Sequence, residues 1–252
     1  MQHSNNEETM NITYQDLNIL FEDNHILVVM KPANVPCQAD ESKDPDMLTL
    51  LKQYLIEKYN KPGDAYLGLV HRLDRPTGGV MVFAKTSKAA SRLSEQIRAG
   101  EVDKKYMCIV EGEPKERSGK LINYLKKYAS QNIIKVVPMA EEGAKYAELD
   151  YKVLETKKGC SLLQIKLVTG RAHQIRVQMA TAGYPLVGDY RYGNAGKYKT
   201  QVPLCLWSTE IRFNHPISGN SMVFRVYPPE EEPWTLFNVN AFLSINMKNY
   251  DY

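Results

Sequence analysis

The sequence His71-Arg72-Leu73-Asp74-Arg75-Pro76-Thr77-Gly78-Gly79 leads directly into the apolar run Val80-Met81-Val82-Phe83-Ala84, which has the length of a buried strand. Asp74 stands between two arginines, and two nearby cations favour the charged form of a carboxyl group. We therefore expect an ionised carboxylate at the start of a buried strand, available as a nucleophile or as an anchor. The alternative is a salt bridge that fixes a turn against a sheet.

Segments with strand character outnumber helical segments along the chain. Apolar spacing predicts helices over residues 44–59, 87–100, 170–183 and 234–242. Ser87 is the expected N-cap of the second helix, and Gly100 is its expected C-terminal stop. Strands are expected from Leu17 and over residues 26–30, 80–84, 105–110, 133–138, 147–154, 161–168, 204–213 and 222–227, with a hairpin turn at 157–159. This pattern predicts an α+β fold with a mixed, largely antiparallel central sheet and flanking helices.

The segment 170–183 brings polar side chains together on one predicted helix. Residues 171–174 are expected to open this helix, and Val177 and Thr181 are expected along its inner side. Arg176 follows His173 by three residues, so both side chains can point into one cleft. The alternative is that these two cationic side chains lie on a solvated helix face.

Composition and charge limit the class of protein. The 252 residues are 43% hydrophobic, which supports a sizeable core in one large domain or two small ones. The net charge of +3 is only mildly basic. Between residues 115 and 135, however, Glu116 is the one acidic residue against six cations: Lys115, Arg117, Lys120, Lys126, Lys127 and Lys135. Such a run indicates either a solvated basic face or contact with phosphate groups.

The cysteines and the N-terminus indicate a soluble, cytoplasmic protein. The four cysteines are far apart and form neither a CxxC pair nor a Cys/His ligand pattern: Cys37, Cys108, Cys160 and Cys205. This spacing argues against a disulfide framework or a zinc site and suits a reducing compartment. Residues 1–8 are polar, and no window approaches eighteen consecutive apolar residues.

Five blocks of the sequence resemble the RluA-type family of RNA pseudouridine synthases. The block HRLDRPTGGVMVFAK, from His71, resembles the family signature HRLD-x-x-TSG. The other blocks resemble the family motifs VVNKPxG, KxYxAxVxG and GRxHQIR…GxPIxGD and the closing block: ILVVMKPA (26–33), KYMCIVEG (105–112), GRAHQIRV (170–177) with GYPLVGD (183–189), and LCL (204–206) with FNHP (213–216). The blocks keep the family's order and cover roughly residues 17–228.

The resemblance implies the pseudouridine synthase fold and the isomerisation of chosen uridines in RNA. This reaction breaks the bond between C1′ and N1, turns the uracil and rejoins it through C5, after the uridine has left the stack. By resemblance, Asp74 is the nucleophile or the carboxylate that activates the sugar, and Arg176 pairs with it. Tyr106 matches the tyrosine that stacks on the base and assists removal of the C5 proton.

The resemblance also implies the partners of the chain. Arg72 matches the arginine that fills the gap left by the flipped uridine. The expected RNA-binding or base-flipping residues are Arg72, His71, Arg75, Thr77, Arg171, His173, Gln174, Lys126 and Lys127. The expected partner is ribosomal or transfer RNA. The protein is expected to be a monomer and not to bind a membrane. No metal or cofactor is expected, because the reaction requires none and the phosphate-binding motifs GxxxxGK[ST] and GxGxxG are missing.

The expected organisation is a flexible N-terminal arm (1–16), a catalytic domain (17–228) and a C-terminal extension (229–252), without the RNA-binding S4 domain that often precedes the catalytic domain in this family. Three positions depart from the family pattern. Gly78 stands where serine is usual, and Gln178 and Trp207 stand where histidines are usual. These changes leave Asp74 and its expected partners in place.

Two other functions remain open on the sequence alone. A catalytically idle RNA-binding or ribosome-assembly protein could use the same scaffold, although such a protein has no need of a paired nucleophile. A carboxylate-based hydrolase of nucleosides or sugars is the second alternative. It lacks an evident second, suitably spaced carboxylate and leaves the basic run 115–135 unexplained.

Overall fold

The computed structural model describes residues 12–193 and 202–244. Within these residues one sheet holds eleven strands: β1 (Asn18–Glu22), β2 (Ile26–Lys31), β3 (Gly68–Leu69), β4 (Gly78–Ala84), β5 (Asp103–Glu111), β6 (Ser118–Tyr128), β7 (Ile133–Val137), β8 (Lys145–Lys157), β9 (Cys160–Leu167), β10 (Leu206–Asn214) and β11 (Ser221–Arg225). The helices of the described residues are α1 (Met47–Tyr59), α2 (Ser87–Ala99), α3 (Gln174–Thr181) and α4 (Val239–Ser244), with short 3-10 helices η1 (Tyr14–Asp16), η2 (Ala129–Gln131) and η3 (Trp234–Leu236).

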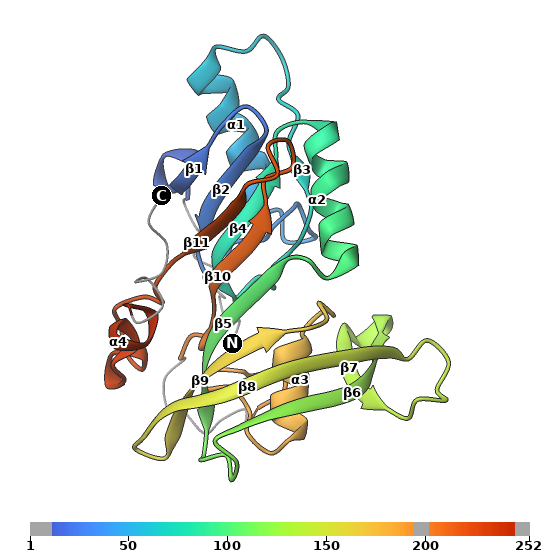
Figure 1. Cartoon of the computed structure of the whole chain (residues 1–252), viewed down its shortest axis with the longest axis vertical. Coiled ribbons are helices and arrows are strands. Elements are labelled where there is room, and N and C mark those ends of the chain that lie inside the picture. The colour runs from blue at the N-terminus through green and yellow to red at the C-terminus, as the bar shows by residue number, and fades with distance from the viewer. Residues whose placement is uncertain (1–11, 194–201, 245–252) are drawn as a thin grey trace, which may run out of the picture.

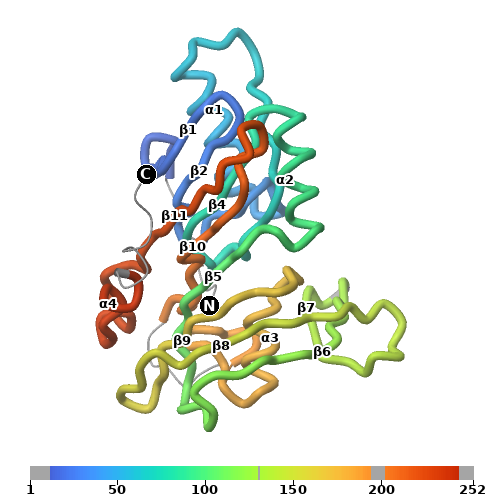
Figure 2. Tube along the Cα trace, viewed as in Figure 1, coloured from blue at the N-terminus to red at the C-terminus, as the bar shows by residue number. Residues whose placement is uncertain are grey.

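The sheet runs the length of the molecule in the order β1-β2-β4-β10-β5-β9-β8-β6-β7, with β11 beside β10 and β3 beside β4 (Figures 1 and 2). Neighbouring strands pair antiparallel except β4 and β10, which are parallel. The predicted α+β fold with a mixed, largely antiparallel sheet is therefore confirmed. Central strands β4, β10 and β5 place the loop 71–77 near the middle of the molecule.

Both faces of strand β4 are buried, as its unbroken apolar run predicts. Met81 and Phe83 enter the core on the face that carries α1 and α3. Val80 and Val82 enter the core on the opposite face, which carries α2 and the C-terminal segment. Since side chains alternate across a strand, a strand covered on both faces is apolar at every position.

The helix boundaries follow local capping. Helix α2 begins at Ser87, but its N-cap is Thr86, whose side chain accepts a hydrogen bond from the backbone N–H of Ala89. The N-cap predicted at Ser87 is therefore wrong by one residue. Gly100 ends the helix in the left-handed conformation with φ of 74°, as predicted.

Helix α3 is shorter and more deeply buried than predicted. It begins at Gln174, because His173 has a left-handed backbone with φ of 52° that cannot belong to the helix. Residues 171–173 thus form a turn instead of opening the helix. Thr181, expected on the inner side, is exposed. The buried positions include Arg176, which packs between the sheet and the loop 71–77.

Strand β6 lies within the basic run 115–135, at residues 118–128, for which no strand was predicted. It pairs with β8 and β7, and the β6–β7 hairpin extends to one side of the molecule (Figure 1). Two of its three lysines are tolerated in a strand because neighbouring segments supply carboxylates. Lys120 pairs with Glu148 of β8, and Lys126 pairs with Glu141 at 2.6 Å.

The two ends of the described chain pack on the core. Ile12 and Tyr14 contact the face that carries α1, so the arm predicted as flexible over residues 1–16 is structured from residue 12 onward, and residues 1–11 lie outside the described residues. The helix predicted over 234–242 is divided into η3 and α4. Trp234, Phe237 and Leu243 are buried against the sheet, whereas residues 245–252 lie outside the described residues.

Candidate active site

A cavity of about 920 Å³ opens on the face of the sheet that carries α1 and α3. The loop 71–77, the loop 36–40, the turn between α2 and β5, and the segment 167–176 line it. Lys127 of β6 completes one side. Segments far apart in the sequence meet here because β4 and β5 begin, and β9 ends, beside the cavity.

Asp74 lies at this cavity and takes its partners from α3 and from the turn before it. One carboxylate oxygen, Oδ2, lies 3.4 Å from Nη1 of Arg176, and the other, Oδ1, lies 4.0 Å from Nε2 of His173. The backbone carbonyl of Asp74 accepts a hydrogen bond from the N–H of Thr77 at 2.9 Å, which closes the turn before β4. His173 and Arg176 both line the cavity, as predicted, and the predicted pairing of Arg176 with Asp74 is present.

The two arginines adjacent in sequence do not pair with Asp74. Arg75 pairs with Asp44 and donates from Nε to the carbonyl of Asn34 at 3.1 Å, so it fixes the loop before α1. Arg72 is exposed, lines the cavity and makes no hydrogen bond or ion pair within the described residues. The alternative of a salt bridge between Asp74 and Arg72 or Arg75 is therefore wrong; the guanidinium comes from Arg176, 102 positions later, as the resemblance predicts.

Arg176 is held in place by a second carboxylate, that of Asp189. Its Nε and Nη2 donate to the two oxygens of Asp189, both at 2.8 Å, which is the bidentate geometry of strong guanidinium–carboxylate pairs. Burial opposes ionisation of Asp189, but the hydrogen bonds and charge of Arg176 outweigh it and lower the pKa of Asp189. Because Asp189 fixes two of the guanidinium nitrogens, Nη1 is left to face Asp74.

Tyr192 adds a further contact that the sequence did not reveal. The guanidinium of Arg176 lies over its ring, 5.2 Å from the centroid. Its hydroxyl accepts from the N–H of Ile134 at 3.1 Å and lies 2.6 Å from Nδ1 of His173. Tyr192 therefore joins the β6–β7 hairpin to both His173 and Arg176. The sequence signal available was the block that ends at Asp189, three residues earlier.

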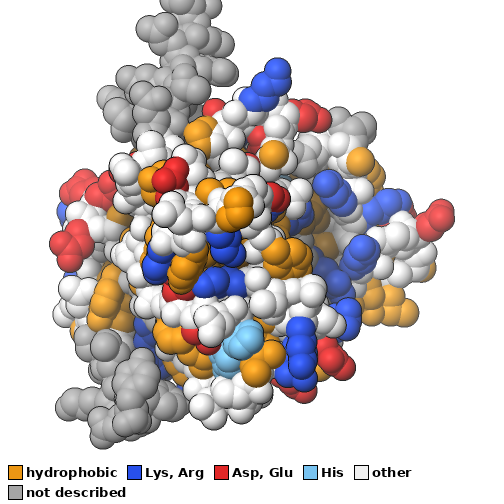
Figure 3. Space-filling view, turned by 90° about the horizontal axis from the view of Figure 1, so that it is seen from above, with side chains coloured by type: hydrophobic (Ala, Val, Ile, Leu, Met, Phe, Trp, Pro, Cys, Tyr) orange, Lys and Arg blue, Asp and Glu red, His pale blue; other side chains and the backbone are white. Residues whose placement is uncertain are grey.

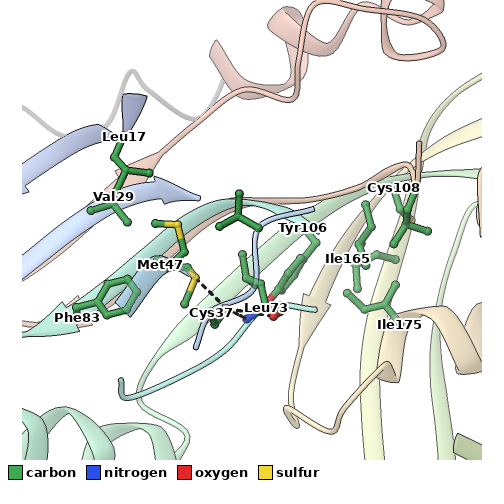
Figure 4. Packing of buried hydrophobic residues seen from close by; sticks show 14 of the residues in the cluster. Leu17, Val29, Cys37, Met47, Leu73, Phe83, Tyr106, Cys108, Ile165 and Ile175 are labelled. Carbon is green, nitrogen blue, oxygen red and sulfur yellow. Dashed lines mark hydrogen bonds between the residues drawn. The ribbon is translucent and has the colours of Figure 1, made fainter. Parts of the chain in front are cut away.

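Tyr106, on β5, lines the cavity and is 6% exposed. Figure 4 shows its ring beside Leu73 of the loop 71–77, on the face where Ile175 also lies. Burial, aided by the negative charge of Asp74, raises the pKa of Tyr106 above its ordinary value. The phenol is therefore neutral at physiological pH.

Buried polar groups fix the loop 71–77 to the strands around it. Lys31, fully buried at the end of β2, donates from Nζ to the carbonyls of Pro32 at 2.9 Å and Arg75 at 3.0 Å. The thiol of Cys37 donates to the carbonyl of Leu73 at 3.2 Å and accepts from its N–H at 3.4 Å (Figure 4). These contacts define the backbone that carries Asp74.

His71 fixes the start of the same loop. Its Nε2 accepts a hydrogen bond from the N–H of Val82 in β4 at 3.1 Å, which requires a neutral ring. Burial lowers the pKa of His71 from 6.5 to about 3, and the charge of Lys104 adds to the effect. His71 was predicted to contact RNA, but its ring accepts a hydrogen bond from the chain's own backbone.

Acid is expected to weaken the fold through His71. The folded protein holds this ring neutral, whereas the unfolded chain takes up a proton as the pH falls below 6.5. The free energy of unfolding should therefore fall between pH 6.5 and 3, by up to about 1.4 kcal/mol per pH unit from this one group. Urea unfolding at pH 7, 6 and 5 measures the loss. The free energy of unfolding of wild type should exceed that of His71→Gln by less as the pH falls. Equal pH dependence of the two free energies would contradict the assignment.

Of three other predicted RNA contacts, Gln174 and Thr77 are buried, whereas Arg171 is exposed but bonds to the chain's own backbone. The Gln174 side chain is buried: its Oε1 accepts from the Arg171 N–H at 2.9 Å and its Nε2 donates to the Glu148 carbonyl at 3.0 Å. Arg171 donates from Nε to the carbonyl of Tyr146 at 2.9 Å, although it also lines the cavity. Thr77 is 2% exposed at the cavity floor. Gln174 and Arg171 therefore hold the turn that presents His173.

The adjacent lysines of β6 point to opposite sides of the hairpin, as alternation in a strand requires. Lys126 pairs with Glu141 and lies over the ring of Tyr128. Lys127 lines the cavity and, within the described residues, has neither a hydrogen bond nor an ion pair. The structure brings Lys127, and not Lys126, to the site.

Gly78 and Trp207, two of the departures from the family pattern, are neighbours. They are paired across β4 and β10, and a Cβ atom added to Gly78 would lie 2.1 Å from the indole ring of Trp207. The indole thus occupies the space of a side chain at position 78. The third departure, Gln178, is buried and donates from Nε2 to the carbonyl of Leu121 at 3.1 Å, which ties α3 to β6.

Serine at position 78, usual in the family, is expected to destabilise this chain. Gly78→Ser would force the indole of Trp207 to move, and such overpacking costs roughly 1–3 kcal/mol. The variant Gly78→Ser/Trp207→His should be more stable than the two single substitutions predict by addition, because the smaller ring makes room. Urea unfolding of the four proteins gives the coupling free energy. Additive losses would show that the two side chains do not compete for space.

Within the described residues, no group of three or more His, Cys, Asp and Glu side chains is placed to hold a metal ion. The four cysteines are free thiols. Among the described helices, none has the length and apolar character needed to cross a membrane.

Comparison with known proteins identifies the family. The model of the RNA pseudouridylate synthase family matches residues 25–181. A ribosomal large subunit pseudouridine synthase D of Zymomonas mobilis is 33% identical over 85% of this chain and 70% of its own length. A ribosomal large subunit pseudouridine synthase C of Escherichia coli is 33% identical over 85% of this chain, which spans 66% of that relative. The solved structure of human RNA pseudouridylate synthase domain containing 4 has the same fold, with a TM-score of 0.71 at 22% identity over 84% of this chain and 89% of the human chain. The chain belongs to the RNA pseudouridylate synthase family.

Proposed function

We propose that this chain converts specific uridines of RNA into pseudouridine, with Asp74 as the catalytic carboxylate. The observation that carries the proposal is the contact between Asp74 and Arg176 in a cavity that Tyr106 also lines. A carboxylate held by a guanidinium is poised to act at the sugar or base of a bound uridine. The membership of the chain in a family of RNA isomerases supports the same reaction.

Different residues of the cavity act in different steps of the isomerisation. Asp74 acts on the nucleoside while the N1–C1′ bond breaks, and Arg176 fixes the rotamer of its carboxylate through one N–H. Tyr106 presents a flat, neutral ring to the uracil as the base turns to offer C5. A neutral phenol is a weak base, so we assign Tyr106 to stacking and hydrogen bonding of the base while the C5 proton passes to water and N1 takes up a proton.

The free cations of the cavity are proposed to bind the RNA. Arg72 is exposed at the entrance, next to Asp74, where its planar guanidinium can stack in the gap that the extruded uridine leaves. Lys127 faces the cavity from the hairpin. Figure 3 shows Lys and Arg side chains gathered toward the side on which the β6–β7 hairpin extends. These positions suit a phosphate backbone that crosses from the loop 71–77 to the hairpin.

We further propose that the substrate is large-subunit ribosomal RNA, modified in the cytoplasm by the monomeric protein. The relatives named as ribosomal large subunit synthases support this substrate over transfer RNA. Free thiols, three of them buried, are compatible with a reducing compartment. Analytical sedimentation of the purified protein tests whether it is a monomer.

Lys127→Gln is expected to weaken binding of ribosomal RNA, whereas Lys126→Gln is not. Loss of one phosphate contact should lower the slope of log affinity against log salt by about one unit. Lys126 is the matched control because it is adjacent in sequence, carries the same charge and pairs with Glu141 on the other side of the hairpin. Fluorescence anisotropy at several salt concentrations measures both slopes. Equal losses of RNA affinity in the two variants would contradict a contact between Lys127 and the RNA backbone.

The test of the proposed function is direct mapping of the product. Ribosomal and transfer RNA transcribed in vitro are incubated with the protein, and pseudouridine is located by carbodiimide treatment and primer extension. We expect new stops at one or a few uridines of large-subunit ribosomal RNA. Binding without any new pseudouridine would favour the idle RNA-binding protein, and modification confined to transfer RNA would overturn the choice of substrate.

A further inference from the structure

One cation of the cavity, Lys104, has no hydrogen-bond or ion-pair partner within the described residues and no role in the steps above. It lies on β5 two residues before Tyr106, so the two-residue period of a strand puts both side chains on the cavity face. The intervening residue, Lys105, points to the other face and pairs with Glu210 at 2.9 Å. Lys104 therefore faces the cavity, whereas Lys105 forms a structural ion pair.

The ammonium of Lys104 lies beside the turn before α3 and lines the same cavity as the loop 71–77. A Cβ atom on Gly170 would lie 3.4 Å from Nζ of Lys104, which places the ammonium beside the turn that leads to His173. Its positive charge also acts on His71, at the start of the loop that carries Asp74. An anion bound to Lys104 would thus lie within the active site.

Lys104 is half-buried and, within the described residues, makes no hydrogen bond or ion pair. The carboxylate of the preceding residue, Asp103, pairs with Lys166 at 3.1 Å, and Asp74 is engaged by Arg176. Burial accordingly lowers the pKa of Lys104, because no charge compensates for its lost hydration. A desolvated cation without a partner among the residues that the structure describes indicates a site that an anion completes.

We propose that Lys104 binds a phosphate group of the target uridine and so positions the flipped nucleotide between Asp74 and Tyr106. The inference rests on the proposed function, since RNA supplies the anion. A compact ammonium suits a single phosphate oxygen, and a phosphate contact fixes position without reading the base. Lys104 is thus a substrate-positioning residue whose contact forms as the uridine enters the cavity.

The test compares Lys104→Gln with Lys166→Gln. The control removes the same charge from the adjacent strand β9, at an exposed lysine that pairs with Asp103 outside the cavity. The substrate is a synthetic RNA hairpin around the mapped uridine, with a neutral methylphosphonate replacing the phosphate on either its 5′ or its 3′ side. Affinity, kcat and KM are measured for each protein and each RNA, and urea unfolding checks the fold.

Lys104→Gln is expected to weaken binding of the unmodified hairpin roughly 10- to 100-fold, the range of a charge-assisted hydrogen bond. Lys104→Arg should restore most of the affinity, and Lys166→Gln should stay within twofold of wild type. At one of the two positions the methylphosphonate should weaken wild type by a similar factor and leave Lys104→Gln unchanged. Independent losses at both positions, or unchanged affinity in Lys104→Gln, would overturn the proposal.

The two proposals fail separately. If wild type isomerises the RNA and Lys104→Gln behaves like Lys166→Gln, the phosphate site is wrong and the proposed function stands. If wild type binds RNA without isomerising it, the proposed function is wrong. In that case the salt dependence of total-RNA binding still tests Lys104, because one lost phosphate contact should lower the slope by about one unit, and an unchanged slope would overturn the site.

Discussion

Replacement of Asp74 by Asn is expected to lower the rate of isomerisation by at least about 10³-fold. The amide has the size of the carboxylate but carries no charge and is not a nucleophile. It can still accept the hydrogen bond from Nη1 of Arg176, so the geometry of the loop 71–77 should be kept. Single-turnover assays on the mapped RNA, with enzyme in excess, give the chemical rate.

Two controls separate chemistry from folding and binding in Asp74→Asn. Urea unfolding should show a stability close to that of wild type, because the polar contacts that hold the loop use Lys31, Cys37 and His71. Affinity for RNA should be retained, because the proposed phosphate contacts come from other residues. A variant that folds, binds and still turns over within tenfold of wild type would exclude Asp74 as the catalytic carboxylate.

Arg176→Met is expected to reduce both stability and activity. It leaves the buried carboxylate of Asp189 without its bidentate partner, and breaking a buried ion pair in this way costs about 3–5 kcal/mol. It also removes the guanidinium beside Asp74, which should lower turnover independently. Urea unfolding gives the first effect, and single-turnover rates well below the unfolding transition give the second.

The double variant Arg176→Met/Asp189→Asn distinguishes these two effects. The neutral amide removes the unpaired charge, and its oxygen can still accept from the N–H groups of Arg191 and Tyr192, which bond to Asp189 at 3.0 and 3.1 Å. Stability should therefore recover in part, while activity should stay low because Asp74 still lacks Arg176. Recovery of both together would mean that Arg176 serves only the fold.

The elements that the sequence predicts well are those in which local pattern and tertiary environment agree. The run of β4 is apolar at every position because both faces of the strand are covered. The turn at 157–159 has Lys158 and Gly159 at positive φ between two alternating segments, as a tight hairpin requires. Asp74 stands out because an ionisable residue immediately before a buried strand has few structural reasons to be there.

The elements that the sequence does not predict depend on partners distant in the chain. The lysines of β6 indicate a solvated loop until Glu141 and Glu148 are placed beside them. The N-terminal boundary of α3 depends on the left-handed conformation of His173. In this conformation the His173 ring forms a hydrogen bond with the hydroxyl of Tyr192. Spacing along the helix gives no sign of that turn.

The candidate site follows the same division. Sequence pattern and family resemblance identify Asp74, Tyr106 and Arg176, and the structure places all three at one cavity. Asp189, which fixes the guanidinium, lies in a matched block but carries no local mark of its role. The difference between Lys126 and Lys127 arises only from the direction of the side chains in β6, a strand that the sequence does not predict.

The measurement that tests the central claim most directly is tritium release from large-subunit ribosomal RNA transcribed with uridine labelled at C5. Isomerisation through C5 must expel that hydrogen, whereas binding alone cannot. We predict release by wild type in step with the appearance of pseudouridine, and no release above background by Asp74→Asn at equal RNA occupancy. Equal release by both proteins would contradict a catalytic role for Asp74, and no release from any RNA that wild type binds would contradict the isomerase itself.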